Sequence, residues 1–510
     1  MSAARALRAI AVALAVAFVA LWLGVALARL GHPFELEWLE GGSLDHVRRV
    51  LEGRPLYGPP SLEFTPFMYT PLYYYASAVS AHAFGPTLPA LRLVSLLASL
   101  ATLVLLGDLV RRETGRVSAG LLAAGLYAAT FRISGAWFDV ARVDALCLAL
   151  VAASLYALRV GRSAASALAS GVLLALAVQT KQVAALAVLP FALAAWPASR
   201  RRAWQFTAAF LLAAGATAVA CDHASGGWYR YYVFTLTRQH QLIPRELWAF
   251  WLRDLVWPLP FALAIVVAAA RTAGPHRAAL RFHAVAGAGL LAMALISRMN
   301  VGGYHNVVMP AHLLAALLFG LAAGGLDGSR WSTALHAACA VQLLMRGYDP
   351  RRLVPTAADR AAGERLVADL RARPGPILLP SHPYLLPLAG HPGHAHQMAL
   401  NDVLLNERHQ EIRQLVAAPL REALRERRYR AIVLDPWFWF RAEVERCYRL
   451  EAPAFADERV FWPVTGAPTR PEAVYVPGGA GPCDDMPPES ASRPPPDAYR
   501  DPSAKSSSSP

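Results

Sequence analysis

The stretch RAIAVALAVAFVALWLGVALARLGHPFELEWLEGG, residues 8–42, decides the fold. Its first part, residues 8–30, is an apolar run long enough to span a bilayer, which takes about 20 residues. Three carboxylates, Glu35, Glu37 and Glu40, follow as soon as the run ends. We therefore expect a membrane helix and then an acidic segment at or just outside the membrane surface.

The composition of the whole chain is that of an α-helical, multi-spanning membrane protein. Of its 510 residues, 55% are hydrophobic and only 16% are charged, whereas soluble proteins carry about 25% charged residues. The net charge of +14 comes from 49 Lys and Arg against 35 Asp and Glu. In a membrane protein such basic residues orient the helices and attract anionic lipids. We expect membrane lipids, and no nucleic acid, among its partners.

Residues 1–30 allow two interpretations. Arg5, Arg8, the apolar run and the sequence Ala26-Leu27-Ala28 are also features of a signal peptide. The run is longer than the roughly 7–15 apolar residues of a signal peptide. We therefore favour an uncleaved first helix, and the segment after it is exported under either interpretation.

Apolar runs and basic loops together predict about 11 spans. The predicted spans are 8–30, 89–110, 117–134, 143–159, 166–179, 182–197, 204–220, 252–270, 280–297, 306–324 and 330–346. Four loops between them are basic and should be cytoplasmic. Their basic residues are Arg111, Arg112 and Arg116; Arg159 and Arg162; Arg200, Arg201 and Arg202; and Arg271, His276 and Arg277. This places the N-terminus in the cytoplasm and the C-terminal region outside.

That topology requires that PLYYYASAVSAHAFG, residues 71–85, does not cross the membrane. Its tyrosines favour a helix in the outer interface, where Tyr rings prefer to lie. In the alternative, this segment spans the membrane and another short one does not.

The composition changes after Tyr348, which divides the chain into a transmembrane domain, residues 1–348, and a small extracytoplasmic α/β domain, residues 349–476. TAADRAAGERLVADLRARPG predicts an amphipathic helix, PILLP and AIVLDP predict buried strands, and the stretch 401–428 between them is typical of helix. The Pro- and Ser-rich tail, residues 477–510, should be disordered. Cys447 and Cys483 can pair if this region is outside the cell, but the sequence does not decide it.

The first outer loop, residues 31–88, contains the acidic segment and a predicted helix from Ser43 to Glu52, with Ser43 as its N-cap. Glu37 and Glu40 are candidate catalytic carboxylates. The alternative is a solvated loop with an interfacial helix.

Three further positions carry ionisable residues near apolar runs. Asp144 begins one such run, and an unpaired charge within the bilayer costs about 2.5–3.5 kcal/mol, so it is either functional or paired with Arg142. Lys181 interrupts another run and is suited to hold a phosphate, or it snorkels to the interface. Arg298 and His305 lie in a late outer loop and are either phosphate ligands or ordinary loop residues.

In this order, these elements resemble the GT-C superfamily of membrane glycosyltransferases over roughly residues 8–325. The similar branches are the protein O-mannosyltransferases, the lipid A aminoarabinose transferases and the lipopolysaccharide galacturonosyltransferases. The motifs that carry the resemblance are YTPLYYY from Tyr69, ARVDAL with Asp144, Thr180-Lys181 and YHNVVMP. The chain departs from the family where it has spaced Glu37 and Glu40 instead of adjacent acids, and Asp144-Ala145 instead of Asp-Pro.

The resemblance implies transfer of a sugar from a polyprenyl-phosphate donor to a glycan, lipid or protein acceptor on the outer membrane face. It implies Glu37 or Glu40 as the base, and Asp144 as the group that positions the acceptor or a divalent metal. Lys181, with Arg298 or His305, would hold the phosphate, and Tyr69 would contact the substrate. Two other functions remain open from the sequence: a lipid or glycan transporter, which predicts ionisable residues at mid-bilayer and an inverted repeat, and a non-catalytic envelope-assembly protein with this fold.

Overall fold

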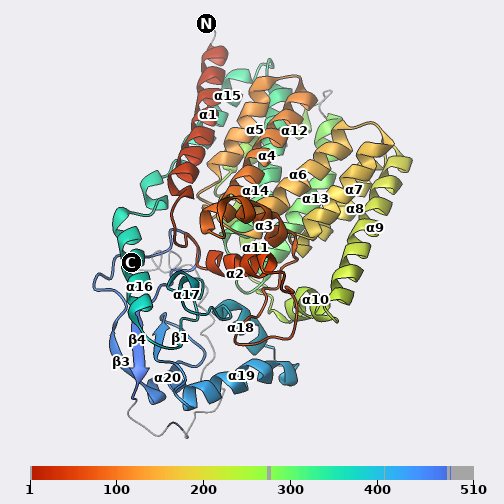
Figure 1. Ribbon diagram of the computed structural model, residues 1–510. Helices are drawn as coiled ribbons and strands as arrows, with labels where there is room; N and C mark the ends of the chain where they lie inside the picture. The colour runs from red at the N-terminus through yellow and green to blue at the C-terminus, as the bar shows by residue number, and fades with distance from the viewer. Residues whose placement is uncertain (1–2, 273–276, 407, 479–482, 484–510) are drawn as a thin grey trace.

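The computed structural model describes residues 3–272, 277–406, 408–478 and 483. A bundle of long helices forms its upper part, and a smaller region with a β-sheet lies below one end of that bundle (Figure 1). The helices of the bundle are α1 (Ala3–Leu30), α4 (Leu88–Thr114), α5 (Val117–Ala129), α6 (Val143–Val160), α7 (Ala164–Val178), α8 (Val188–Ala195), α9 (Arg200–Ala224), α12 (Pro260–Arg271), α13 (Arg277–Met299), α14 (Met309–Leu326) and α15 (Ser332–Leu344).

Each predicted span overlaps one of these helices, but a count of 11 spans is not confirmed. Six helices among the described residues are long and apolar enough to cross a membrane, or seven if the pair Glu246–Val256 and Pro260–Arg271, bent by 90°, is one span. Four shorter apolar helices lie beside them: Val117–Ala129, Ala164–Val178, Gln182–Ala195 and Ser332–Leu344. The chain is a multi-pass membrane protein, as predicted.

Small residues let these helices approach one another closely. A Cβ atom added to Gly125 of α5 would lie 2.3 Å from the Cβ atom of Ala15 in α1. A Cβ atom added to Gly320 of α14 would lie 2.6 Å from that of Ala123 in α5. Close backbone contact between small residues is a main source of helix association in membranes, since lipid tails are as apolar as the side chains.

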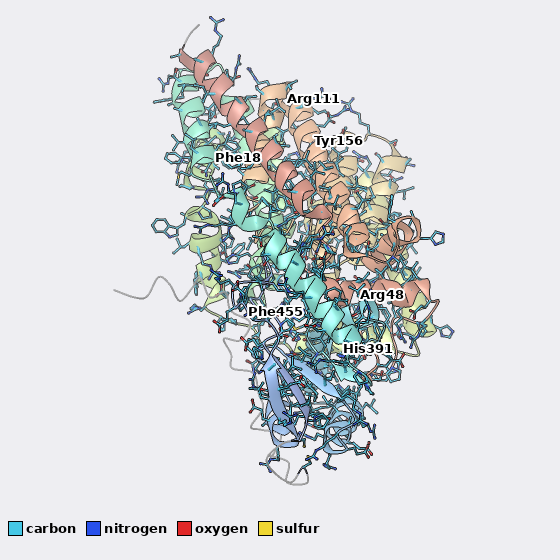
Figure 2. All side chains as sticks on the ribbon, turned by 60° about the vertical axis from the view of Figure 1, so that its left-hand side comes forward. Phe18, Arg48, Arg111, Tyr156, His391 and Phe455 are labelled. Atoms are coloured by element: carbon cyan, nitrogen blue, oxygen red, sulfur yellow. The ribbon has the colours of Figure 1, made fainter. Side chains whose placement is uncertain are left out.

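The order of the helices along the chain places the basic loops at one end of the bundle and the loops with the candidate site residues at the other. The four basic loops lie at the end where α1 begins, and Arg111 marks this end in Figure 2. The end of α1, the starts of α4, α6 and α14, and the ends of α7 and α13 all lie at the other end. The candidate residues of the sequence therefore gather at one end of the bundle.

Two short helices cover that end, α2 (Glu40–Leu51) and α3 (Leu72–Phe84). Helix α2 begins three residues earlier than predicted, so the predicted cap, Ser43, lies inside it and donates a hydrogen bond to the Leu39 carbonyl over 3.3 Å. Helix α3 has 13 residues. It is about 20 Å long, too short to cross a core of about 30 Å, which agrees with the predicted interfacial position.

The C-terminal region, residues 349–478, contains a four-stranded sheet in the order β1-β2-β4-β3. Strands β1 (Ile377–Leu378) and β2 (Ala431–Leu434) are the two predicted from the sequence, and they pair in parallel. Strands β3 (Tyr448–Pro453) and β4 (Ala473–Pro477) were not predicted, and each pairs antiparallel with its neighbour. The helices of this region are α16 (Ala357–Ala372), α17 (Leu385–Leu388), α18 (Gln397–Leu404), α19 (Gln410–Arg425) and α20 (Arg441–Cys447).

Helix α16 and the helical stretch near 401–428 occur where they were predicted, and Thr356 and Asp359 form a capping box at the start of α16. The domain limits at 348 and 476 stay a prediction. The predicted disordered tail lies outside the described residues from 479 on, except for Cys483. Cys447 and Cys483 are free thiols in this structure.

Candidate functional site

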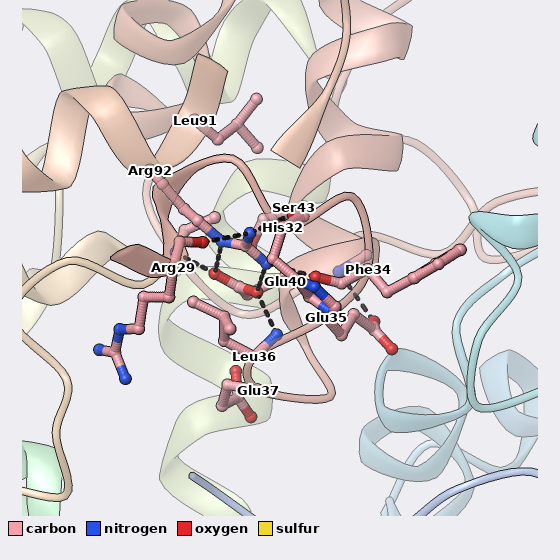
Figure 3. Close-up of polar contacts among 12 residues, drawn as sticks. Arg29, His32, Phe34, Glu35, Leu36, Glu37, Glu40, Ser43, Leu91 and Arg92 are labelled. Atoms are coloured by element: carbon pink, nitrogen blue, oxygen red, sulfur yellow. Dashed lines mark hydrogen bonds and ion pairs between the residues drawn. The ribbon is translucent and has the colours of Figure 1, made fainter. Parts of the chain in front are cut away.

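Glu40 is held in a buried, fully paired arrangement at the start of α2 (Figure 3). Arg92 of α4 donates to it from Nε over 2.9 Å and from Nη2 over 2.5 Å. The backbone N–H groups of Leu36 and Ala141 each donate to it over 2.7 Å. Both carboxylate oxygens are thus saturated, and the Arg92–Glu40 pair joins the first loop, α4 and the loop before α6.

Arg92 also fixes the shape of the acidic segment. Its Nη1 donates to the His32 carbonyl and its Nη2 to the Phe34 carbonyl, each over 2.5 Å. A second buried pair lies beside it, in which Arg29 of α1 donates to both oxygens of Asp139 over 2.7 Å. Two arginines at the ends of membrane helices therefore anchor the first and second outer loops.

Glu37 has fewer partners than Glu40. Its carboxylate is 1% exposed and pairs with Arg142 Nη1 over 3.2 Å. Arg142 Nη2 donates to the Tyr69 hydroxyl over 3.1 Å, and the Arg142 guanidinium also lies over the rings of Tyr69 and Trp137. The alternative pair expected from the sequence, Asp144 with Arg142, is replaced by this Glu37–Arg142 pair because the acidic segment folds back over the start of α6.

Asp144, in the first turn of α6, instead pairs with Lys181. The distance from Lys181 Nζ to Asp144 Oδ1 is 2.7 Å, and Trp137 Nε1 donates to Oδ2 over 3.0 Å. Lys181 Nζ also lies 5.9 Å from the centre of the Tyr69 ring. Tyr69 therefore links the Glu37–Arg142 pair to the Asp144–Lys181 pair, and these five residues with Trp137 form what we call the cation-acid cluster.

A cavity of about 330 Å³ opens beside this cluster. Asp144 and Lys181 line one side of it, and Asn306 of the late loop lines another. The rest of its wall is mostly apolar and comes from the membrane helices, at Cys147, Leu148, Val183, Met293, Val307, Met309 and Pro310. A charged mouth above an apolar wall suits a ligand with an anionic head and a hydrocarbon tail.

The two glutamates differ in proton affinity. Burial raises the pKa of Glu37 to about 8, and Arg142 only partly offsets it. Burial also acts on Glu40, but there Arg92 and the two backbone N–H groups hold the pKa below its usual value. Glu37 is therefore the carboxyl that can exchange a proton near neutral pH, and Glu40 stays ionised.

The C-terminal region closes over Glu37. A Cβ atom added to Gly466, which has a φ of 81°, would lie 2.7 Å from Glu37 Cγ. The backbone N–H of Thr465 donates to the Leu36 carbonyl over 3.2 Å, and its hydroxyl donates to the Gly135 carbonyl. Only glycine fits so close to Glu37 with a left-handed backbone.

Arg298, at the end of α13, lies apart from the cation-acid cluster. Arg298 donates to Asp254 over 3.1 Å and to the Gly303 carbonyl over 2.5 Å, so its guanidinium is engaged in a separate ion-pair network with Arg253 and Glu246. The Cβ atom of His305 lies 3.2 Å from the Cβ position of Gly135, in the loop before α6. The structure thus brings Glu37, Asp144, Lys181 and Tyr69 together, and it pairs Glu40 and Arg298 elsewhere.

The side chains present do not fit a divalent metal at Asp144. Its two oxygens already accept from Lys181 and Trp137, and a hydrogen bond with Asn306 adds to these. Across the described ranges, no group of three or more His, Cys, Asp or Glu is placed to hold a metal ion.

Sequence reasoning missed three members of these networks. Arg29 and Arg92 lie inside predicted apolar helices, and the cost of a charge there was a signal that each has an acidic partner. His382 of the C-terminal region bonds Glu35 over 2.5 Å. No local pattern marks His382, because its partner is 347 positions away in the sequence.

Comparisons with known proteins show what the chain is similar to. Residues 68–225 match the model of the dolichyl-phosphate-mannose-protein mannosyltransferase family. The crystal structure of ArnT from Cupriavidus metallidurans bound to undecaprenyl phosphate is similar with a TM-score of 0.61 and 12% identity, over 91% of this chain and 98% of that chain. No curated protein sequence matches the chain.

A further likeness is too weak to support an argument about the fold. The oligosaccharyltransferase AglB from Archaeoglobus fulgidus, in complex with an inhibitory peptide and a dolichol-phosphate, has a TM-score of 0.47 and 11% identity, over 82% of this chain and 69% of that chain. The family match over residues 68–225 and the fold shared with ArnT confirm that the chain resembles the GT-C superfamily of polyprenyl-phosphate-sugar glycosyltransferases.

Proposed function

We propose that this protein transfers a sugar from a polyprenyl-phosphate donor to an acceptor hydroxyl on the outer face of the cytoplasmic membrane. The observation that carries the proposal is the cation-acid cluster at the mouth of an apolar-walled cavity of about 330 Å³. The ArnT structure contains undecaprenyl phosphate, which has the same combination of phosphate and hydrocarbon chain.

Lys181 and Arg142 are the cations that we assign to the donor phosphate. Lys181 lines the cavity beside Asp144, and both Lys181 and Arg142 lie within 6 Å of the centre of the Tyr69 ring, at 5.9 Å and 5.5 Å. A phosphate that enters takes over part of the hydrogen bonding that Asp144 and Glu37 supply to these cations. Fixed cations stabilise the charge that develops on the leaving phosphate in the transition state.

Glu37 is the base that we assign to the acceptor. The acceptor oxygen forms a bond to the anomeric carbon as the bond from that carbon to the phosphate oxygen breaks. The electron pair of the broken bond stays on the polyprenyl phosphate, and the acceptor proton goes to Glu37. A carboxyl with a pKa of about 8 holds that proton well, since the best proton acceptors have a pKa close to the working pH.

Asp144 positions Lys181 in this scheme, and Tyr69 orders the two cations. Glu40 has its four hydrogen bonds in place already, and we assign it to holding the acidic segment in shape. Arg298 and His305 stay candidates for residues that bind the donor phosphate from the side of the late loop.

Turnover of labelled polyprenyl-phosphate sugars by the purified protein in liposomes tests the proposal. Lys181→Met should lower the rate of polyprenyl-phosphate release about 10²-fold, because one cation that stabilises the leaving group is lost. Arg230→Met, which removes an exposed cation at the same end of the bundle, is the matched control and should keep the wild-type rate. Equal rates in the two variants would remove Lys181 from the donor site, and no release by the wild type with any donor would favour the non-catalytic assembly role.

A further inference from the structure

A second cavity, of about 320 Å³, lies where the first loop meets the C-terminal region. Four aromatic residues contribute to its wall: Phe34, Trp38, Phe461 and Trp462. Figure 3 shows the Phe34 and Glu35 side chains directed away from Glu37, towards the ribbon of the C-terminal region.

The most accessible of these rings is that of Trp462, which is 38% exposed. Its Nε1 donates to the Glu458 carbonyl over 2.8 Å, which fixes the plane of the indole. Phe461 is fixed as well, because its backbone N–H donates to Asp359 over 2.8 Å. Rigid aromatic faces of this kind provide flat apolar surfaces, on which the C–H face of a pyranose ring can pack.

Polar groups meet these rings at one edge of the cavity. His382 bonds Glu35 over 2.5 Å and Asp435 over 3.1 Å, and Thr469 donates to the same oxygen of Asp435. The other oxygen, Asp435 Oδ1, is buried and has no hydrogen-bond partner among the described residues. Asp435 itself is not part of the cavity wall, so the polar side chains that a ligand in the cavity meets include those of Glu35, Asp359, His382 and Thr469.

The charges around the cavity exclude one class of sugar. Asp435 and Glu35 outweigh the effect of burial and raise the pKa of His382 to about 10, so the imidazole carries a proton and both ring nitrogens donate. The carboxyl groups of Glu35 and Asp359 lie in the cavity wall with this imidazole, and Asp435 bonds the imidazole from outside the wall. A uronic acid or a sugar phosphate would add a negative charge to an acidic site, whereas a neutral or amino sugar would not.

We infer that this second cavity binds a neutral or amino pyranose unit of the acceptor, and hence that the acceptor is a glycan. The role as acceptor rests on the proposed function. Its location fits that role, since residues 34–38 supply both Glu37 and the wall of the cavity. The segment 461–469 forms the opposite wall and also carries Gly466, which lies against Glu37.

Saturation-transfer NMR on the full-length protein in nanodiscs tests the inference without any donor. Methyl glucoside and methyl glucosaminide should bind, and methyl glucuronide should bind about tenfold more weakly or not at all. Trp462→Ala should weaken glucoside binding about tenfold, and Trp462→Phe should restore most of it, because one aromatic face is removed and then replaced. Trp331→Ala is the matched control, since Trp331 is 57% exposed at the start of α15 and lies outside the cavity wall.

Two outcomes overturn the inference: glucuronide binding as strong as glucoside binding, or glucoside binding that Trp462→Ala leaves unchanged. Thermal unfolding of each variant shows that it is folded, and Trp462→Gln serves as a second variant if Trp462→Ala is not. Sugar binding without donor turnover would remove the proposed function and leave the saccharide site. Donor turnover without sugar binding would support the proposed function and remove the saccharide site.

Discussion

Glu37 and Glu40 lie in the same loop, on one turn of chain, and both carboxyl groups are buried, yet their surroundings differ. Glu40 accepts four hydrogen bonds, two of them from Arg92. Glu37 has one long ion pair, with Arg142 over 3.2 Å, and the backbone N–H of Leu39. The two pKa values differ because the carboxyl groups have different numbers of hydrogen-bond donors. A buried carboxylate with all its acceptor positions filled keeps its charge, whereas an equally buried carboxylate with fewer donors has a higher proton affinity. The Arg92–Glu40 pair holds the loop in place, and Glu37 is left able to react.

Among the variants that test this comparison, removal of the Arg92 side chain should have the largest effect on stability. Arg92→Leu leaves Glu40 as a buried charge without its partner, which costs about 3–5 kcal/mol. Stabilities of proteins are typically about 5–15 kcal/mol, so the variant should lose a large part of its stability and its yield should fall. The yield of monodisperse protein and the thermal unfolding temperature in detergent measure the change. A variant as stable as the wild type would show that the pair does not anchor the loop.

Replacement of each glutamate by neutral glutamine should separate the role of Glu37 from that of Glu40. Glu37→Gln should lower donor turnover about 10²–10⁴-fold, as expected for the loss of a general base, with little change in unfolding temperature. Glu40→Gln should instead lower the unfolding temperature, since a glutamine amide cannot accept from all four donors. Loss of activity at a wild-type unfolding temperature in Glu40→Gln, with full activity in Glu37→Gln, would exchange the two assignments.

The pH dependence of turnover tests whether the raised pKa of Glu37 controls the reaction. Burial raises the pKa of Glu37 to about 8, so below pH 8 the base is increasingly protonated and cannot accept the acceptor proton. The value of kcat/KM should fall about tenfold for each pH unit below that pKa and reach a plateau above it. A profile that is flat between pH 6 and pH 9 would contradict a titrating Glu37.

The smallest effect is expected at an ion pair on the opposite end of the bundle. Arg111 donates to Asp108 over 2.5 Å, but its side chain is 47% exposed. Arg111→Leu should therefore change the stability by only about 0–1 kcal/mol, in contrast to Arg92→Leu. Thermal unfolding of the two variants side by side gives the difference, and a similar loss in both would mean that burial is not what distinguishes them.

The sequence allowed more of the fold to be predicted than of the site. Long apolar runs locate helices because a span must satisfy its backbone hydrogen bonds internally. The number of spans does not follow, since some apolar runs form helices of only 13 residues, as in α5, or 15 residues, as in α7, which is shorter than the about 20 that a span takes. The end of the bundle at which Asp144 and Lys181 meet follows from the alternation of helices, which makes their contact predictable.

The ion-pair and hydrogen-bond partners within the site were harder to predict from the sequence. Arg142 is two residues from Asp144, and their pairing was an alternative that the sequence left open, but the fold of the acidic segment brings Glu37 to Arg142 instead. Short strands such as β3, which lies at the sheet edge with mostly exposed residues, lack the apolar run that marked β1 and β2. Contacts such as Glu35 with His382 join distant parts of the chain and depend on tertiary structure alone.

The position of Gly466 against Glu37 has a consequence for biosynthesis. Every bundle helix that the structure describes is made before the ribosome reaches residue 466, so the bundle can insert while Glu37 still lacks its cover. A chain released early would contain all these lipid-facing helices and yet leave Glu37 open to water.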